Sequence, residues 1–244
     1  MSNKKKMAQV NSIMINGSNI PIFVIQQEPA IDHELAKNFI PFQNWTQNIN
    51  PKLNISKIVL QHVDYFGKRI GFLKFQVYAT LNGNPVPGIV FMRGHSVCIL
   101  PIITDITTNQ KWIALKREFR MPAGDYMTEL PAGMLDGSGD FVGVAAKEFK
   151  EEMGVPINMS VLISLSEQLK YASIGACDEG LKYMALDLKM SPGEIKELNG
   201  RIAGNKAEGE ETKVVLVKLD DIDSLTNDMK VLCALRMAQR MKLI

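Results

Sequence analysis

The feature that most constrains this chain is a glycine-rich segment followed by a predicted helix that carries three closely spaced carboxylates. The segment covers residues 131–138, and residues 146–155 contain Glu148, Glu151 and Glu152. Like charges at this density destabilise a helix unless a positive charge lies among them. A divalent cation would supply that charge, and Mg²⁺ prefers oxygen ligands. A solvated Lys/Glu face is the alternative interpretation of the same residues.

Helical periodicity places two of these carboxylates together. Gly137 and Gly139 interrupt the chain before residues 142–153, which we predict to be helical. Glu148 and Glu152 are then one turn apart at the edge of the apolar face, whereas Glu151 points further outward. The apolar positions of this helix share one face: Val142, Ala145, Ala146, Phe149 and Met153.

The spacing of these residues resembles the signature of the Nudix hydrolases, G-x5-E-x7-R-E-U-x-E-E-x-G-U, in which U is a large apolar residue. The match begins at Gly133 and keeps every interval through Val155. Two positions depart from the signature, because Gly139 replaces the first Glu and Lys147 replaces the Arg. Asp140 could replace the missing carboxylate in part. Lys147 keeps the charge but lacks the planar fork that an arginine offers to a carboxylate.

The resemblance implies a set of metal ligands. Glu148 and Glu152 are expected to bind the metal ion and to be essential for catalysis, with Glu151 as a ligand of a second ion or a helper. The backbone carbonyl of Ala132 would complete the coordination. The expected cofactor is Mg²⁺, with Mn²⁺ as the alternative.

Flanking segments resemble one group within this family, the ADP-sugar and ADP-ribose pyrophosphatases. Residues 118–122 and 129–133 are similar to segments of that group. Residues 133–136, 139–143, 175–179 and 230–241 are similar to the plant-type ADP-sugar diphosphatases. The implied activity is Mg-dependent hydrolysis of a nucleoside diphosphate sugar, of the ADP-glucose or ADP-ribose type, to AMP and sugar 1-phosphate. Another nucleoside diphosphate-linked substrate, such as a dinucleotide, and a nucleotide-binding module whose catalysis has decayed are the alternatives.

Four further residues are assigned to the site. In ADP-ribose pyrophosphatases the general base is a glutamate on a loop after the signature, and Glu179 is the matching candidate; an ordinary acidic turn is the alternative. Arg120 is expected to bind phosphate or ribose, because a guanidinium suits phosphate oxygens; a surface salt bridge is its alternative role. Glu129 would bond sugar hydroxyls or order the loop, and Arg93 would reach the site from a neighbouring strand.

Composition narrows the partners and the compartment. The formal net charge of +2 is too small to indicate a nucleic-acid surface. No apolar run reaches the roughly 18 residues of a membrane helix. Three scattered cysteines, Cys98, Cys177 and Cys233, fit a reducing compartment without a disulfide framework. We therefore expect a cytoplasmic protein, with an organelle left open, that binds neither nucleic acid nor a membrane. A nucleoside diphosphate sugar is the partner that the resemblance implies.

The predicted elements indicate an α/β (α+β) chain. Strands before and after a central helix, with a second helix at the end, suggest a mixed sheet between helices. The resemblance implies a Nudix α/β/α sandwich over residues 91–244, preceded by a smaller β-rich domain over residues 1–90. That domain is a candidate for packing across a homodimer interface.

Three local predictions depend on weaker patterns. Residues 161–169 are predicted to be a strand, and Pro51 with the surrounding Asn residues suggests a linker. Residues 227–242 are predicted to form a closing helix whose inner stripe is Val231, Leu232, Leu235, Ala238 and Met241.

Overall fold

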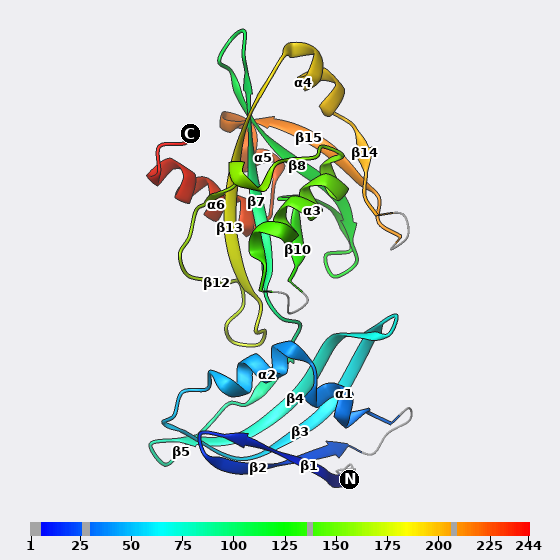
Figure 1. Cartoon of the computed structure of the whole chain (residues 1–244), viewed down its shortest axis with the longest axis vertical. Helices are drawn as coiled ribbons and strands as arrows, with labels where there is room; N and C mark the ends of the chain where they lie inside the picture. The colour runs from blue at the N-terminus through cyan, green and yellow to red at the C-terminus, as the bar shows by residue number, and fades with distance from the viewer. Residues whose placement is uncertain (1–5, 26–29, 136–138, 206–208) are drawn as a thin grey trace. The chain divides into compact units, whose positions relative to one another are not determined.

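The computed structural model describes residues 6–25, 30–135, 139–205 and 209–244, and it divides into two compact units (Figure 1). The first unit comprises residues 1–95 and 171–179, and the second comprises residues 96–170 and 180–244. The boundary therefore follows residue 95, five residues beyond the one predicted. Residues 171–179 belong to the first unit, although in sequence they follow the helix that carries Glu148, Glu151 and Glu152.

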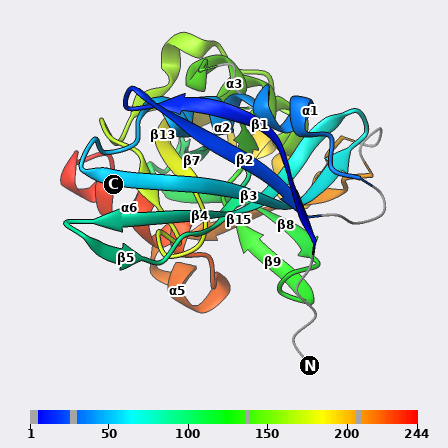
Figure 2. The same ribbon diagram turned by 90° about the horizontal axis from the view of Figure 1, so that it is seen from below.

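The first unit is built on a six-stranded sheet in the order β1-β2-β3-β4-β5, in which β6 also pairs with β4 (Figure 2). In the part of the chain that the structure describes, its strand pairs are antiparallel except β2 with β3, which is parallel. Its strands are β1 (Met7–Ile15), β2 (Ser18–Ile25), β3 (Leu53–Phe66), β4 (Arg69–Leu81), β5 (Asn84–Val86) and β6 (Ile89–Met92).

Two short helices contribute to the core of the first unit. They are α1 (His33–Lys37), which Asp32 caps, and α2 (Ile40–Gln47). The ring of Phe42 on α2 lies edge-on to that of Phe75 on β4 at 5.3 Å, and the ring of Trp45 lies 5.1 Å from Phe75. The sheet thus buries an aromatic core under α2.

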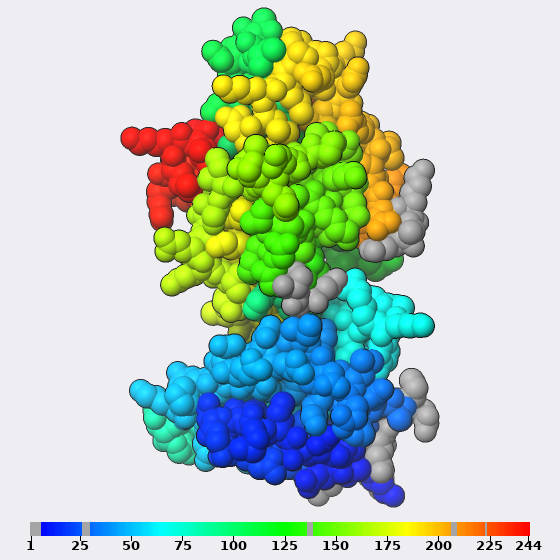
Figure 3. Space-filling model, viewed as in Figure 1, coloured from blue at the N-terminus to red at the C-terminus, as the bar shows by residue number. Residues whose placement is uncertain are grey.

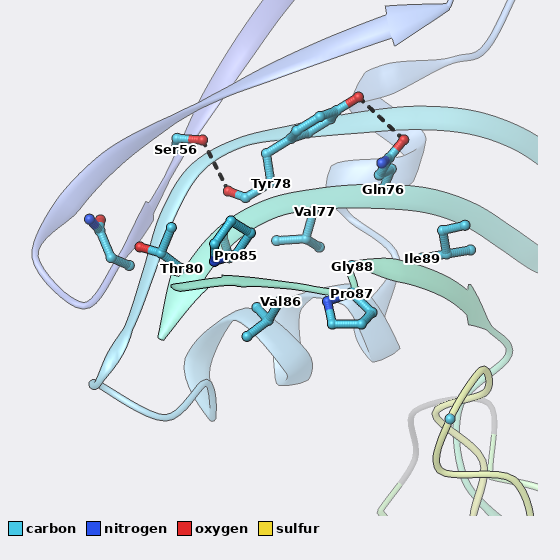
Figure 4. A pocket seen from close by; sticks show the side chains of 13 residues that line it. Ser56, Gln76, Val77, Tyr78, Thr80, Pro85, Val86, Pro87, Gly88 and Ile89 are labelled. Atoms are coloured by element: carbon cyan, nitrogen blue, oxygen red, sulfur yellow. Dashed lines mark hydrogen bonds between the residues drawn. The ribbon is translucent and has the colours of Figure 1, made fainter. Parts of the chain in front are cut away.

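The first unit also has an open pocket of about 680 Å³ along β4, β5 and β6 (Figure 4). The Tyr78 hydroxyl donates to Gln76 Oε1 at 3.3 Å, and the Ser56 hydroxyl donates to the Tyr78 carbonyl at 3.0 Å. Among the described residues, no charged side chain lines this pocket. It therefore lacks the cations that would bind a diphosphate, and the acidic helix belongs to the other unit.

The second unit is built on a nine-stranded mixed sheet in the order β11-β13-β7-β8-β15-β14. In addition, β10 pairs with β7, β12 with β13 and β9 with β8. The pair β13–β7 is parallel, and β8 pairs antiparallel with both β7 and β15. The strands are β7 (Ser96–Asp105), β8 (Lys111–Arg120), β9 (Asp125–Glu129), β10 (Ala132–Met134), β11 (Ile163–Ser164), β12 (Lys170–Tyr171), β13 (Gly180–Met190), β14 (Ile202–Ala203) and β15 (Thr212–Lys218).

Strand β7 shows how helices come to cover both faces of this sheet. Every residue of β7 is buried, and successive side chains point to opposite faces. Cys98, Leu100 and Ile102 pack in one core with helix α6 (Met229–Arg240). Val97, Ile99 and Ile103 pack in another core with helix α3 (Phe141–Met153). These two cores confirm the predicted α/β/α sandwich with a mixed sheet.

Helix α3 has clear start and stop signals. The Asp140 carboxylate accepts a hydrogen bond from the Gly143 N–H at 2.9 Å, which satisfies one free amide at the helix start. Gly154 ends the helix at φ 68°, a left-handed conformation that glycine adopts without strain. In the space-filling view, α3 reaches the visible surface of the second unit (Figure 3). The remaining helical elements are η1 (Met159–Val161), α4 (Pro192–Leu198), η3 (Leu219–Asp221) and α5 (Ile222–Leu225).

Three local predictions were wrong. Residues 161–169 form a 3-10 turn, a two-residue strand and irregular chain, since this segment offers few apolar alternations. The suggested linker at Pro51 is a tight turn, in which the Leu53 N–H donates to the Asn50 carbonyl at 3.0 Å. On α6 the buried residues are Val231, Ala234 and Ala238, whereas Leu232 and Met241 are exposed.

No helix among the described residues is both long enough and apolar enough to cross a membrane. The three cysteines are free thiols, and Cys98 is fully buried in the core that packs against α6.

Candidate active site

Glu152, near the end of α3, is a buried carboxylate whose two oxygens both have partners. Its side chain is only 4% exposed. Oε1 pairs with the ammonium group of Lys116, and Oε2 accepts the Ala132 N–H at 2.9 Å. The Thr212 hydroxyl donates to the Glu152 carbonyl at 2.9 Å and fixes the end of the helix. A buried charge needs such partners, because an unpaired one would be costly.

Lys116 was not identified in the sequence, although strand alternation could have found it. On β8, Ala114 packs into the core that contains α3, so Lys116, Glu118 and Arg120 lie on the same face of the strand. Lys116 is 2% exposed, and its ammonium also pairs with Glu118 Oε2 at 2.8 Å. A lysine at a core-facing strand position indicates a buried acidic partner.

Both members of this pair have a shifted pKa. Burial raises the pKa of Glu152 to about 7, although Lys116 and the Ala132 amide oppose that rise. Burial would lower the pKa of Lys116, but Glu152 and its other acidic neighbours raise it above the ordinary value. Lys116 is therefore the positive charge that the acidic helix requires.

Glu148 lies one turn before Glu152 and directly against the glycine-rich segment. A methyl group on Gly133 would lie 2.0 Å from Cγ of Glu148, so only a glycine leaves room for this side chain. Burial raises the pKa of Glu148 to about 7, with Glu151 adding to the rise and Lys147 opposing it. A carboxylate held in this way is readily ionised by a bound cation.

The remaining signature positions are less buried. Glu151 pairs with Lys147 at 3.8 Å, and the Lys147 side chain is 62% exposed. Asp140, the proposed partial replacement for the first Glu, caps α3. Within the described parts of the chain, no three acidic, His or Cys side chains are grouped as a metal site. A metal ion at Glu148 and Glu152 would therefore need backbone, water or substrate oxygens as further ligands, which Mg²⁺ commonly accepts.

Arg120 and Glu129 form a second charged pair beside the first. The Arg120 Nε donates to Glu129 Oε1 at 2.6 Å, and an Arg120 Nη lies 3.2 Å from Glu118 Oε2. The ammonium of Lys230 on α6 lies 3.5 Å from Glu129 Oε2. Burial alone would raise the pKa of Glu129, but Arg120 lowers it below the ordinary value. Glu129 thus orders Arg120, whose side chain is 39% exposed.

Arg93 and Glu179 lie in the first unit, where they form an ion pair at 3.8 Å. The neighbouring Asp178 accepts the N–H groups of Arg93 and Gly94 at 2.8 and 3.1 Å. Asp178 therefore ties residues 171–179 to the end of β6, and its position is explained by this structural contact. The predicted roles of Arg93 and Glu179 in substrate binding and catalysis stay predictions.

Comparison with known proteins decides the family. No protein-family model matches the chain. The chain is 34% identical over 236 residues to Nudix hydrolase 14, chloroplastic, of Arabidopsis thaliana, covering 88% of this chain and 74% of that protein. The chain belongs to the Nudix hydrolase family. The resemblance seen in the sequence is thereby confirmed, and this Nudix hydrolase is an enzyme, as expected.

A solved structure supports the fold of this Nudix hydrolase. It is described as an ADP compounds hydrolase, and it matches 78% of this chain and 94% of its own with a TM-score of 0.54. The two sequences are 18% identical, so the likeness concerns the fold alone. The likeness therefore supports the overall fold of this chain.

Proposed function

We propose that this Nudix hydrolase cleaves the pyrophosphate bond of a nucleoside diphosphate sugar, of the ADP-glucose or ADP-ribose type, with Mg²⁺ as its cofactor. Water adds across the bridge, so that AMP and a sugar phosphate are released; from ADP-glucose the second product is sugar 1-phosphate. The observation that carries the proposal is the pair of partly and fully buried carboxylates, Glu148 and Glu152, one turn apart beside Gly133. The name of the solved structure with the same fold, an ADP compounds hydrolase, supports an ADP-linked substrate.

The donor set fits a hard divalent cation. Glu148 and Glu152 would hold it, with Glu151 as a ligand of a second ion and Ala132 as a backbone ligand. Such an ion would neutralise the diphosphate and acidify a bound water, and Mn²⁺ would serve the same chemistry. Burial raises the pKa of both glutamates to about 7, which means that their ionised forms are disfavoured. A nearby cation would favour the ionised forms again.

The chain's own residues supply binding and proton transfer. Arg120, held in place by Glu118 and Glu129, offers an oriented guanidinium to phosphate or ribose oxygens. Glu179 is kept as the proposed general base and Arg93 as a proposed substrate-binding residue, both on the family resemblance. We also retain the β-rich domain predicted over residues 1–90 as the proposed homodimer interface.

The decisive test is product detection over a panel of nucleoside diphosphate sugars and dinucleotides, with Mg²⁺, with Mn²⁺ and with EDTA. AMP release from an ADP-sugar that stops on chelation is expected. The Glu152→Gln variant should lose nearly all turnover while it stays folded, because its amide can still accept the Ala132 N–H and Lys116 keeps Glu118 as a partner. Near-normal turnover of that variant, or no hydrolysis of any nucleoside diphosphate sugar by the folded wild type, would refute the proposal.

A further inference from the structure

The ion pair between Lys116 and Glu152 places a cation of the chain itself on the glutamate that we assign to the metal. Both side chains are almost fully buried, with exposures of 2% and 4%. The Ala132 amide donates to the other oxygen, so each oxygen of the carboxylate has a protein partner. The buried charge of Glu152 is thus already neutralised in this structure.

Lys116 has a second carboxylate within reach. Its ammonium lies 2.8 Å from Glu118 Oε2, and Glu118 is two residues further along the same strand. An ammonium group can donate three hydrogen bonds, so Lys116 bridges both carboxylates. If it released Glu152, it would remain paired and would not become an isolated buried charge, which is the costly alternative.

A metal ion and an ammonium group cannot both lie on the same carboxylate oxygen without strong repulsion at such short range. We propose that Lys116 is a tethered counterion that competes with the divalent cation for Glu152 and withdraws onto Glu118 when the metal binds. Lys116 is then a positioning residue that sets the metal affinity of the site. This inference rests on the metal site of the proposed function.

Lys147, the lysine that occupies the arginine position of the signature, is the natural comparison. It carries the same charge near the same helix face, but it is 62% exposed and contacts only Glu151, at 3.8 Å, among the ion pairs of the described chain. A pair this exposed is weak. The cation that contacts the buried carboxylate therefore lies on strand β8, whereas Lys147 contacts the less buried Glu151.

The experiment measures the affinity for Mn²⁺ alone, without nucleotide, by titration of the free ion in electron paramagnetic resonance. Lys116→Met keeps the length of the side chain and removes its charge. We expect Mn²⁺ to bind about tenfold more tightly to this variant, the scale on which groups around a metal ligand act. Lys147→Met, the matched control, should change the dissociation constant by less than about threefold, because its charge is exposed to solvent.

Two outcomes of this titration would overturn the inference. If Lys116→Met binds Mn²⁺ as weakly as the wild type, or more weakly, Lys116 supports the ligand and does not compete with the metal. If the wild-type protein and the Glu152→Gln variant are alike in binding no Mn²⁺, the inference fails together with the proposed function. In the first outcome Mn²⁺ still binds to the wild type, so the metal site of the proposed function stands. In the second outcome no Mn²⁺ binds, so the two failures are distinguishable.

Stability and a second variant keep the test decisive. Metal-free Lys116→Met should melt at a lower temperature than the wild type, because Glu152 loses its partner. Saturating Mn²⁺ should raise the melting temperature of the variant by more than it raises that of the wild type. If Lys116→Met does not fold, Glu118→Gln serves, since Glu152 is then the remaining ion-pair partner of Lys116 among the described residues. The dissociation constant of Mn²⁺ should be at least about threefold higher for Glu118→Gln than for the wild type, because Lys116 then stays on Glu152. Unchanged binding would overturn the inference.

Discussion

Gly133 packs directly against the side chain of Glu148. A methyl group at Gly133 would lie 2.0 Å from Cγ, 2.2 Å from Cδ and 2.4 Å from Oε1 of that glutamate, all well inside van der Waals contact. The atoms in the way belong to a flexible side chain and not to the backbone. The glycine of the signature is therefore required for the position of a carboxylate more than for the fold of the loop.

Gly133→Ala should accordingly damage activity more than stability. Glu148 must rotate away from the added methyl group, and a misplacement of about 1 Å in such a site costs about a hundredfold in kcat. The melting temperature should change little. Steady-state kinetics and thermal unfolding measure the two effects. Gly193→Ala is the control, because a methyl group there would come no closer than 4.0 Å to any described atom outside the adjacent residues and the backbone of its own helix. Equal activity of both variants would contradict this role of Gly133.

The Asp178 carboxylate should stabilise the first unit locally. Asp178→Ala removes charged hydrogen bonds to the N–H groups of Arg93 and Gly94, which should cost about 2 kcal/mol in the free energy of unfolding. Hydrogen exchange of peptides covering residues 90–95 and 171–179 should accelerate. Asp64→Ala, which removes an exposed contact with His62 at 3.3 Å, should leave both measurements nearly unchanged. Unaltered hydrogen exchange in Asp178→Ala would show that these hydrogen bonds are not needed to hold residues 171–179 in place.

The ion pair between Glu129 and Arg120 should make the stability of the protein depend on pH. Because Arg120 lowers its folded-state pKa below the ordinary value of 4.5, the ionised form contributes stability above that pH, and the contribution is lost as the pH falls through the folded-state pKa. Glu129→Gln should lower the free energy of unfolding by about 2 kcal/mol at pH 7. The difference from wild type should shrink below pH 4.5 in denaturant titrations.

The control for this prediction is Glu197→Gln, which removes an exposed carboxylate on α4. Its stability should follow the wild type at every pH. A constant gap between Glu129→Gln and the wild type from pH 7 down to pH 3 would mean that packing, and not charge, explains the effect.

The sequence predicted the features that depend on local pattern. The bounds of α3 were predicted to within one residue from the glycines before it and from its apolar periodicity, and in the structure Asp140 caps its start and Gly154 ends it. Strand β7 coincides with an apolar run, and its burial on both faces, which is seen in the structure, agrees with that composition. The family assignment rests on spacing within the signature, which is also local.

The features that the sequence pattern does not reveal depend on tertiary contacts. Helix α2 lacks a side-chain cap, and what holds it is the packing of Phe42 and Trp45 on Phe75. The partner of Glu152 is 36 residues away on β8, so no spacing rule within the signature could identify it. Likewise, residues 171–179 join the first unit through pairing of Phe91 with Cys177 and through Asp178, at separations of about 85 residues.

Arg120 should act by geometry as well as by charge. Its Nε donates to Glu129 and one Nη contacts Glu118, which leaves the guanidinium plane oriented by two carboxylates. Arg120→Lys keeps the charge but cannot bond Glu129 and a phosphate in one plane, so the KM for an ADP-sugar should rise about tenfold. If Arg120 binds the ground state and the transition state equally well, kcat stays near the wild-type value.

Arg117→Lys is the matched control, because Arg117 is exposed on the other face of the same strand and lies over Tyr126 at 5.2 Å. An unchanged KM in Arg120→Lys, with Arg117→Lys also unchanged, would remove Arg120 from the substrate-binding residues and leave it as a structural partner of Glu129.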